Sequence, residues 1–506
     1  MAKALTMPSG INIPAAARVW FYALTSLVPL LWLLWQGQTN LLVTLLVSIV
    51  MIGIALARPE LGICLTIAYL FLLGDIRRIP GMFLGYPAFD TLLLVGPLLS
   101  LILAVPLLIR VRLEDSISKA VLTLMVVMTL EIFNPRQGPV TVGLAGAMFY
   151  LVPMLWFWIG RRYGTDKVLF AVLYRVLFPL GVLAAALGIC QTYVGFLPWE
   201  SAWVAAVIDH YHALNLGGGF VRSFGFSVNG VEYADLLLVT SSFTLAAFFA
   251  GKRVYGLFFP LVATALFLAS SRTSIVKLLF SVAISWALSN RSGRGWAVRL
   301  PIGLAVGIGA LALALSQIGG GDSTGKQTSA AQASTQHQVG GLSHPFDKKY
   351  STAGMHSQML TQGIIRGFTN PIGSGLGSTT LALGKFAEGS GSTDDQLGSS
   401  EVDISDAFLA MGFIGGLTYL ATILLVLRRA IIFGRSSAKH LALPVLGILA
   451  AMGGAWIALG QYGIAPLVWF VIGALSRPRP YEITAQSTKL PAPTRLRTQA
   501  LSASAR

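Results

Sequence analysis

The chain has 506 residues, of which 55% are hydrophobic and only 11% are charged, and its mean hydropathy is +0.72. A soluble globular protein carries about 25% charged residues, so this composition excludes that class and indicates a membrane protein with many spans. The formal net charge of +16 does not indicate a nucleic-acid partner, because the basic residues lie mostly in short loops between apolar runs, where they determine topology.

Apolar runs long enough, or nearly long enough, to span a bilayer recur along the whole chain. They lie at about 19–35, 39–57, 60–74, 88–109, 117–132, 144–160, 168–193, 229–250, 254–270, 273–289, 301–316, 404–427, 440–456 and 462–475. This pattern predicts an all-α fold, a polytopic membrane helical bundle of about 14 transmembrane helices.

The distribution of Lys and Arg predicts the orientation of the bundle. Most of the 36 basic residues fall in alternate connecting segments and in the C-terminal tail, and such segments stay in the cytoplasm. We therefore expect both termini in the cytoplasm and a long polar segment, 317–403, on the outer face. The predicted units are 1–316 with the first eleven helices, the outer loop 317–403, 404–476 with the last three helices, and a disordered cytoplasmic tail at 477–506.

The outer loop 317–403 is the one polar stretch long enough to cover a site on the outer face. Its first part, about 318–344, is rich in Ser, Gln, Ala and Gly, a composition typical of flexible segments. Its second part is predicted to be helical near 355–358. It then reaches the sequence NPIGSGLG at 370–377 and an acidic end at 401–406.

Two arginines on the predicted outer face oppose the charge bias. Arg222 precedes the span that starts near 229, and Arg272 lies in the short turn between two spans. A guanidinium group stays charged and binds paired oxyanions, as in a diphosphate, through parallel hydrogen bonds. Both arginines are therefore candidate diphosphate-binding residues, and Lys277, further along the same predicted helix as Arg272, is a third. The alternative is that each side chain extends to the phosphates of membrane lipids.

Four motifs follow one another on the predicted outer face: Arg222-x-x-Gly225 with Asn229, Ser271-Arg272-Thr273 between two apolar helices, NPIGSGLG at 370–377, and a span that begins near FLAMGFIGG at 408–416. This ordered set resembles the O-antigen ligase and polymerase superfamily of integral membrane glycosyltransferases. The resemblance implies a GT-C-like fold and a metal-independent, inverting glycosyl transfer that uses no cofactor. It also implies a donor glycan on undecaprenyl diphosphate at the outer face of the bacterial inner (cytoplasmic) membrane, with Arg222 and Arg272 on the diphosphate.

The ligases of this family carry a histidine, taken as the general base, at the position of Glu401, with Asp403 and Asp406 close by in this chain. A carboxylate accepts a proton from an acceptor hydroxyl, the more so when burial raises its pKa. These three acids are therefore the candidate catalytic residues, and the departure from the ligase pattern favours a polysaccharide polymerase. The alternative for each acid is a solvated loop end.

Five further residues of the outer loop are candidates for substrate contact. His356 and Arg366 lie on the predicted loop helix, and Gly373, Gly375 and Gly377 permit a tight backbone turn pressed against a substrate. Solvated side chains and an ordinary flexible turn are the alternatives. The sequence contains no set of ligands that predicts a metal site.

The predicted function is polymerisation of lipid-linked oligosaccharide repeat units into exopolysaccharide or O-antigen. The predicted partners are the lipid-linked glycan, membrane lipid, and a flippase and a chain-length regulator of the same pathway. Two alternatives stay open: an O-antigen ligase that transfers glycan to lipid A core or to protein, and a transporter of polysaccharide or small solutes. A transporter predicts ion-coupling acids at the bilayer midplane, and the predicted spans contain few acids.

Overall fold

The structure is a computed structural model that describes residues 33–87, 90–109, 111, 113, 115–208, 214–217, 219–289, 295–318, 329–344, 347, 353–380, 402–436, 438–453, 455–457 and 463–477. Every predicted apolar run from 39 onward coincides with a helix in these residues. The first predicted run, 19–35, falls almost entirely outside them, and so do Glu401 and the tail after 477.

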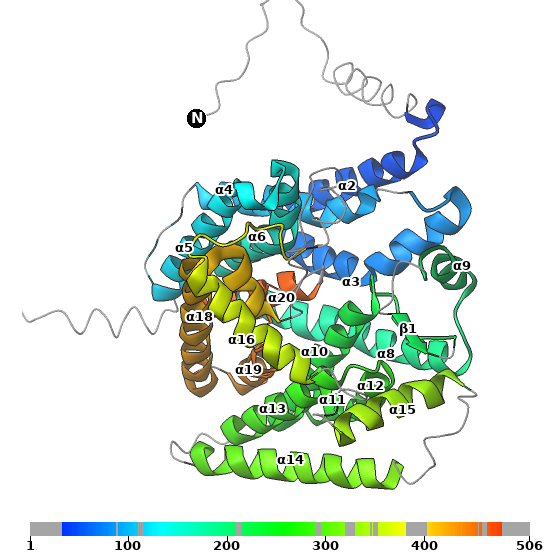
Figure 1. Ribbon diagram of the computed structural model, residues 1–506, viewed down its shortest axis with the longest axis vertical. Coiled ribbons are helices and arrows are strands. Elements are labelled where there is room, and N and C mark those ends of the chain that lie inside the picture. The colour runs from blue at the N-terminus through cyan, green and yellow to red at the C-terminus, as the bar shows by residue number, and fades with distance from the viewer. Residues whose placement is uncertain are drawn as a thin grey trace, which may run out of the picture.

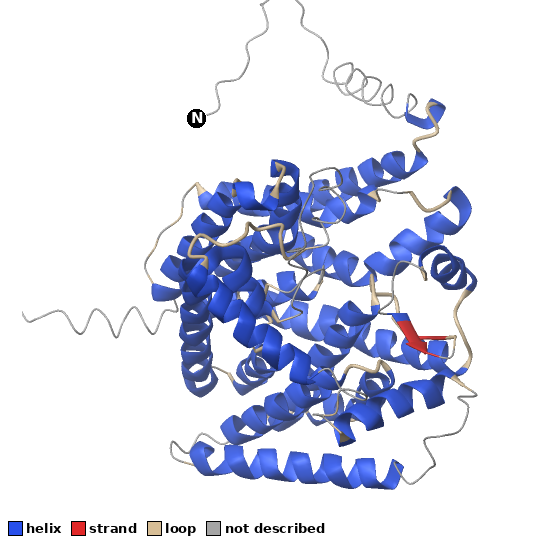
Figure 2. Cartoon of the chain, in the orientation of Figure 1, coloured by secondary structure: helices blue, strands red, loops and turns tan. Residues whose placement is uncertain are grey.

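Helices pack into one bundle (Figure 1), and the described residues contain a single two-stranded hairpin (Figure 2). The first half of the chain forms α2 (Thr39–Ala57), α3 (Pro59–Leu84), η1 (Thr91–Leu94), α4 (Val95–Leu108), α5 (Ser116–Glu131), η2 (Pro135–Gln137), α6 (Val140–Tyr163), α7 (Asp166–Phe170), the π-helix η3 (Ala171–Leu177), α8 (Phe178–Tyr193) and α9 (Pro198–Val207). The second half forms β1 (Asn215–Gly217), β2 (Phe220–Val221), α10 (Gly230–Phe249), α11 (Arg253–Gly256), α12 (Phe259–Leu268), α13 (Arg272–Ser289), α14 (Trp296–Ile318), α15 (Ala330–Ser343), α16 (Ala353–Thr369), α18 (Asp403–Ser436), α19 (Lys439–Ala451) and α20 (Ile464–Ser476).

In the described part of the chain, eight helical stretches are long and apolar enough to cross a membrane. They are Thr39–Ala57, Pro59–Leu84, Thr91–Leu108, Val140–Tyr163, Asp166–Tyr193, Gly230–Phe249, Arg272–Ser289 and Asp403–Gly434. Four shorter apolar helices lie at Arg253–Leu268, Ala297–Leu313, Lys439–Ala451 and Ile464–Ser476. The predicted all-α fold is therefore confirmed, and the apolar helices are those of a membrane-embedded protein.

Helix α20, one of the two shortest of these helices, is buried along its whole length and packs on α6. The two backbones approach closely because glycines lie at the contact: a Cβ atom on Gly160 would lie 2.0 Å from the carbonyl oxygen of Phe470, and one on Gly473 would lie 2.0 Å from that of Phe157. Small residues allow this approach where apolar driving force between helices is weak, as in a bilayer.

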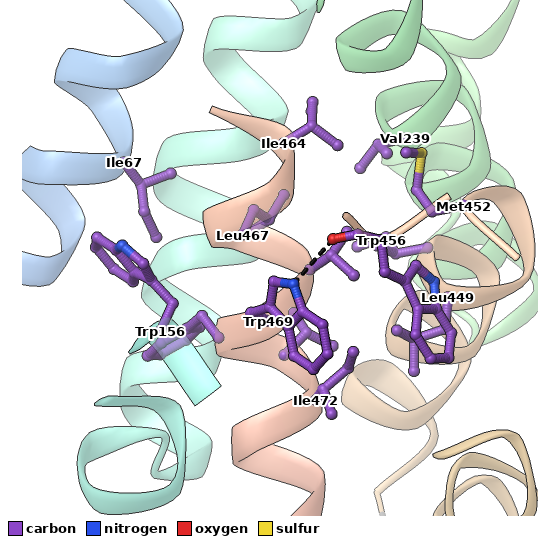
Figure 3. Packing of buried hydrophobic residues seen from close by; sticks show 14 of the residues in the cluster. Ile67, Trp156, Val239, Leu449, Met452, Trp456, Ile464, Leu467, Trp469 and Ile472 are labelled. Carbon is purple, nitrogen blue, oxygen red and sulfur yellow. Dashed lines mark hydrogen bonds between the residues drawn. The ribbon is translucent and has the colours of Figure 1, made fainter. Parts of the chain in front are cut away.

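Three fully buried tryptophans fill the space around α20 (Figure 3). Trp469 of α20 donates its indole N–H to the carbonyl oxygen of Trp456 at 2.9 Å. Trp156 of α6 donates its indole N–H to the hydroxyl of Ser100 at 2.8 Å. Each of these two indoles thus has a hydrogen-bond acceptor at its polar end while its ring packs among apolar side chains, including Phe470 for Trp156 and Trp456 for Trp469.

A break in α18 explains the glycine-rich sequence at 370–377. Gly412 has φ 64° and ψ −166°, so the helix hydrogen-bond ladder is interrupted there. The carbonyls of Leu409 and Ala410, just before the break, accept instead from the backbone N–H groups of Ser374 and Gly375 at 2.9 and 3.0 Å. The turn that follows α16 therefore completes the hydrogen bonding of α18.

Arg78 of α3 is the most deeply buried cation that the structure describes, at 2% exposure. Its guanidinium donates to the carbonyl oxygens of Gly225, Ser227 and Val228 at 3.4, 2.6 and 3.2 Å, and to the carboxylate of Asp75 at 3.2 Å. The segment between β2 and α10 is irregular, so its carbonyls lack helical partners. Arg78 supplies those partners, and it ties this segment to α3.

The same segment is held from a second side. Gln191 of α8 accepts from the N–H groups of Phe224 and Gly225 at 3.0 and 2.8 Å, and its amide donates to the carbonyl of Gly225 at 3.1 Å. The Arg78 guanidinium lies over the rings of Trp203 and Phe224, 4.3 and 4.2 Å from their centroids. The position of the chain just after Arg222 is thus determined by α3, α8 and α9 together.

Replacing Arg78 with Met should destabilise the protein strongly, by about 3–5 kcal/mol, because a carboxylate and three carbonyls lose their partner in the interior. Arg77→Met is the matched control: Arg77 is the neighbouring residue and pairs with Asp90 at 2.5 Å where both side chains are partly exposed, so the cost is about 0–1 kcal/mol. The melting temperatures of the two detergent-purified variants measure the difference. Equal losses would contradict the role assigned to Arg78.

Candidate functional site

Arg222 directly follows the second strand of the hairpin. Its backbone N–H donates to the carbonyl of Leu214 at 2.8 Å, which continues the pairing of β1 with β2 by one residue. The residues after it are held by Arg78 and Gln191 as described above. The side chain of Arg222, which is half-buried, therefore starts from a fixed backbone position.

Arg272 is the first residue of α13, and it follows a strained turn. Ser270, at the end of α12, has φ 58°, the one positive φ of a non-glycine residue that the structure describes. Such a conformation costs of order 1 kcal/mol or more and persists only where surrounding contacts hold it. The Ser270 hydroxyl donates to the carbonyl of Ser334 in α15 at 3.4 Å and to that of Leu268 at 3.3 Å. The hydrogen bond from Ser270 to Ser334 thus joins the strained turn to α15.

The two guanidinium groups meet at one nitrogen atom, Nε2 of His337 in α15. The Nη2 atom of Arg222 lies 3.2 Å from it, and the Nη2 atom of Arg272 lies 3.0 Å from it. Arg272 also donates to the backbone carbonyl of His337 through Nε and Nη2, at 3.2 and 2.9 Å. Arg222 and Arg272 thus converge beneath a segment of the loop 317–403, and their predicted role in binding a diphosphate stays a prediction.

His337 is neutral in this position. Burial, followed by the positive charges of Arg272 and Arg222, lowers the pKa of His337 from its usual 6.5 to about 4. Because both arginines are obligate donors, Nε2 must be the unprotonated nitrogen that accepts from them, and the proton is assigned to Nδ1. A neutral lone pair thus occupies a place between two cations that suits an oxyanion better.

His337 was not among the predicted site residues, because it lies in the segment, about 318–344, whose composition predicts flexibility. That segment instead contains α15, which begins after the cap residue Ser329, whose hydroxyl accepts from the N–H of Gln332 at 3.2 Å. Helix α15 packs on α8, α12, α13, α14 and both strands (Figure 1). The signal available in the sequence was Ser329 as a helix cap, followed by His337 at helical spacing from the small residues Ala333 and Ser334.

Gly341 gives Arg272 access to α15. A Cβ atom on Gly341 would lie 2.1 Å from Nε and 2.2 Å from Cζ of Arg272. The guanidinium therefore lies directly on the helix backbone, one turn beyond His337, and reaches the carbonyl oxygen of that residue. Any side chain at 341 would displace either Arg272 or the helix.

A second polar group lies at the start of α18. The carboxylate of Asp403 accepts from the backbone N–H of Ile457 at 2.9 Å, and it interacts electrostatically with Asp406, Asp235 and Lys277. Asp406 is 2% exposed. Both aspartates therefore lie on a helix within the bundle, and not at the solvated loop end that was the alternative prediction. Glu401 lies outside the described residues.

Lys277 is found with these acids, since the charges that act on His337 are those of Arg272 and Arg222. A position five residues after Arg272 is rotated by about 140° around the helix, so Arg272 and Lys277 of α13 are directed to different sides. The predicted contact of Lys277 with a diphosphate stays a prediction. Instead, α13 links the two groups: its first residue, Arg272, belongs to the arginine pair, and Lys277, about one and a half turns later, interacts with Asp403.

The loop helix α16 packs on the first part of α18. The Ser405 hydroxyl donates to the carbonyl of Met359 at 2.9 Å, and the ring of Phe368 stacks on that of Phe408 with centroids 6.0 Å apart. The two helices therefore run in the same direction, and half-buried His356 lies one turn before Met359 on α16. Arg366 is exposed on α16, and its contact with a substrate stays a prediction.

Gly373, Gly375 and Gly377 press against the protein itself. Cβ atoms at these positions would lie 2.4 Å from the carbonyl of Ala410, 2.6 Å from the side chain of Gln137 and 2.2 Å from the carbonyl of Val142. Gly373 and Gly375 also have φ of 83° and 98°, which glycine adopts without strain. The predicted tight turn is present, its neighbours are α6, η2 and α18, and a contact with substrate stays a prediction.

Comparisons with known proteins assign no family to this chain. No family model matches it, and no curated protein or solved structure matches it. The functional proposal below therefore depends on the residues and on their geometry.

The stability of the protein should fall as the pH falls from about 6.5 to about 4, in part because of His337. The imidazole takes up a proton at pH 6.5 in the unfolded chain but only near pH 4 in the folded chain, so the unfolded state binds more protons across this window and is favoured. His337→Gln keeps an acceptor for both arginines and does not titrate. Melting temperatures from pH 7.5 to 4 should show a steeper acid loss for the wild type than for the variant; parallel curves would contradict the assignment.

Proposed function

We propose that this protein is a metal-independent inverting glycosyltransferase that polymerises oligosaccharide repeat units carried on undecaprenyl diphosphate. In this proposal the bundle has a GT-C-like arrangement of about 14 spans in the bacterial inner membrane, with both termini in the cytoplasm and α15 on the outer face. The observation that carries the proposal is the convergence of Arg222 and Arg272, from separate elements, on one nitrogen of His337.

The arginine pair suits a diphosphate better than it suits its present occupant. The two guanidinium groups meet at one neutral lone pair of His337, and Arg272 also donates to the neutral backbone carbonyl of that residue. A diphosphate offers several charged oxygens at the same place. Exchanging the imidazole for the diphosphate gains charge-assisted hydrogen bonds, which are about twice as strong as neutral ones. Fixed cations of this kind stabilise the charge that develops on a leaving group.

The proposed step is a displacement at the anomeric carbon of the donor glycan. The acceptor hydroxyl oxygen forms the new glycosidic bond, and the bond from the anomeric carbon to the diphosphate oxygen breaks. The electron pair stays on the diphosphate, where Arg222 and Arg272 hold it, and the hydroxyl proton passes to a carboxylate. No nucleotide is consumed, because the sugar arrives already activated.

The position of the acids supports this assignment of roles. In an inverting displacement the nucleophile and the leaving group lie on opposite faces of the anomeric carbon, so the base must lie apart from the diphosphate. Among the described residues, the charges that act on Asp403 are those of Asp406, Lys277 and Asp235, and the charges that act on His337 are those of the two arginines, so the acids lie apart from the arginine pair. The carboxylates at 401–406, in place of the ligase histidine, favour the polymerase over the ligase.

Removing either arginine should abolish most of the activity. Arg222→Ala and Arg272→Ala should each lower turnover by about 100- to 1000-fold, the range for losing one leaving-group or oxyanion contact, while Arg77→Ala, a control at a paired arginine outside the site, should retain it. The assay is incubation of purified protein with a lipid-diphosphate-linked repeat unit, read as a ladder of polymer on a gel. Wild-type turnover in both variants would contradict the proposal. A single transfer of glycan to lipid A core, without a ladder, would indicate a ligase.

One carboxylate of the acidic group should act as the general base. Among Glu401→Gln, Asp403→Asn and Asp406→Asn, one variant should lose about 100-fold or more in turnover without losing affinity for the lipid-linked donor. The same ladder assay, combined with donor binding, separates a chemical role from a binding role. If all three variants keep their turnover, the base is not among these acids.

A further inference from the structure

Gln338, the residue after His337 in α15, is fully buried with its amide unused. Its exposure is 0%, and neither its Oε1 nor its Nε2 atom has a hydrogen-bond partner among the residues that the structure describes. A buried amide normally satisfies both atoms, and one left without partners costs about as much as the hydrogen bonds it has lost. Such a group needs an explanation, and a ligand or a water is the usual one.

The contacts on either side of Gln338 show which part of the protein it faces. One turn earlier on the same face of α15, the carbonyl of Ser334 accepts from Ser270. One turn later, Gly341 lies against the guanidinium of Arg272. Gln338 lies between these two contacts, so it belongs to the face of α15 that packs on the strained turn and on Arg272, beside the position that we assign to the diphosphate.

The two substituents of a polyprenyl diphosphate glycan differ in their hydrogen-bonding capacity. The polyprenol is a hydrocarbon and offers no donor or acceptor. The sugar attached to the diphosphate offers hydroxyl or acetamido groups, each of which donates and accepts at once. A primary amide, with one acceptor oxygen and two N–H donors, matches such a group.

We propose that the Gln338 amide binds the first sugar of the donor, the one attached directly to the diphosphate, through a hydroxyl or acetamido group of that sugar. This inference rests on the proposed function, because it takes the arginine pair to hold the diphosphate. Helix α15 then has two roles. His337 occupies the anion site before the substrate enters, and Gln338 binds the sugar that is attached to the diphosphate. Discrimination of this kind arises because a site with a buried polar group rejects ligands that leave it unpaired.

The test compares two probes on the purified full-length protein in nanodiscs: farnesyl diphosphate, and farnesyl diphosphate that carries N-acetylglucosamine on its terminal phosphate. The wild type should bind the sugar-bearing probe about ten-fold more tightly, the gain expected from one well-made buried hydrogen-bonded group. Gln338→Leu, which keeps the size of the side chain, should bring the affinity for the sugar-bearing probe down to that for farnesyl diphosphate. It should leave the affinity for farnesyl diphosphate unchanged within about two-fold.

Gln336→Leu is the matched control, a half-buried glutamine two residues away on the same helix, and it should retain the ten-fold preference. Three results would overturn the inference: no preference in the wild type, a preference that survives in Gln338→Leu, or an equal loss for both probes. The last would show that Gln338 only supports the fold. The arginine pair is tested separately, because Arg222→Ala should weaken both probes; if it weakens neither, the proposed function fails whatever Gln338 does.

Discussion

The position of the candidate site depends on the guanidinium of Arg78, which holds the chain just after Arg222 but is not itself one of the site residues. This buried side chain donates to three carbonyls between Gly225 and Val228, and so determines where the chain runs between the hairpin and α10. An irregular segment inside a bundle is stable only if its backbone groups find partners, and a guanidinium supplies several donors in one plane. The chain between Arg222, at the end of the hairpin, and the start of α10 is therefore held in place although it forms neither helix nor sheet.

Helix α15 contributes His337, the residue on which both arginines of the site converge. It brings a neutral imidazole between Arg222 and Arg272, two side chains that would otherwise repel one another, and it holds the strained Ser270 turn through a backbone carbonyl. The helix is polar on its buried face and makes its closest contact with Arg272 across Gly341. A face that is held by hydrogen bonds to two cations, with little apolar burial, can be exchanged for an anion at modest cost, since the anion satisfies the same donors.

Several particular features could be read from the sequence and others could not. The helices follow from apolar runs, and Arg222 and Arg272 could be singled out because both lie where a predicted span begins on the outer face. His337 and Gln338 were not predicted, because a Ser-, Gln- and Ala-rich segment has too little hydrophobic contrast to distinguish a docked helix from a flexible loop. Asp403 and Asp406 were predicted as candidate residues, but their place within α18, beside α16, came from packing.

The sequence by itself determined the all-α class, the positions of the apolar helices, and the occurrence of two cations at helix boundaries, because these properties depend on residues that are neighbours in the chain. The tertiary structure alone decided which side chains meet. Arg78 finds the carbonyls of 225–228, and Ser374 and Gly375 find the carbonyls that the break at Gly412 leaves open. These contacts join segments that are far apart in sequence, and they form because buried polar groups must be paired wherever the packed helices happen to bring a partner.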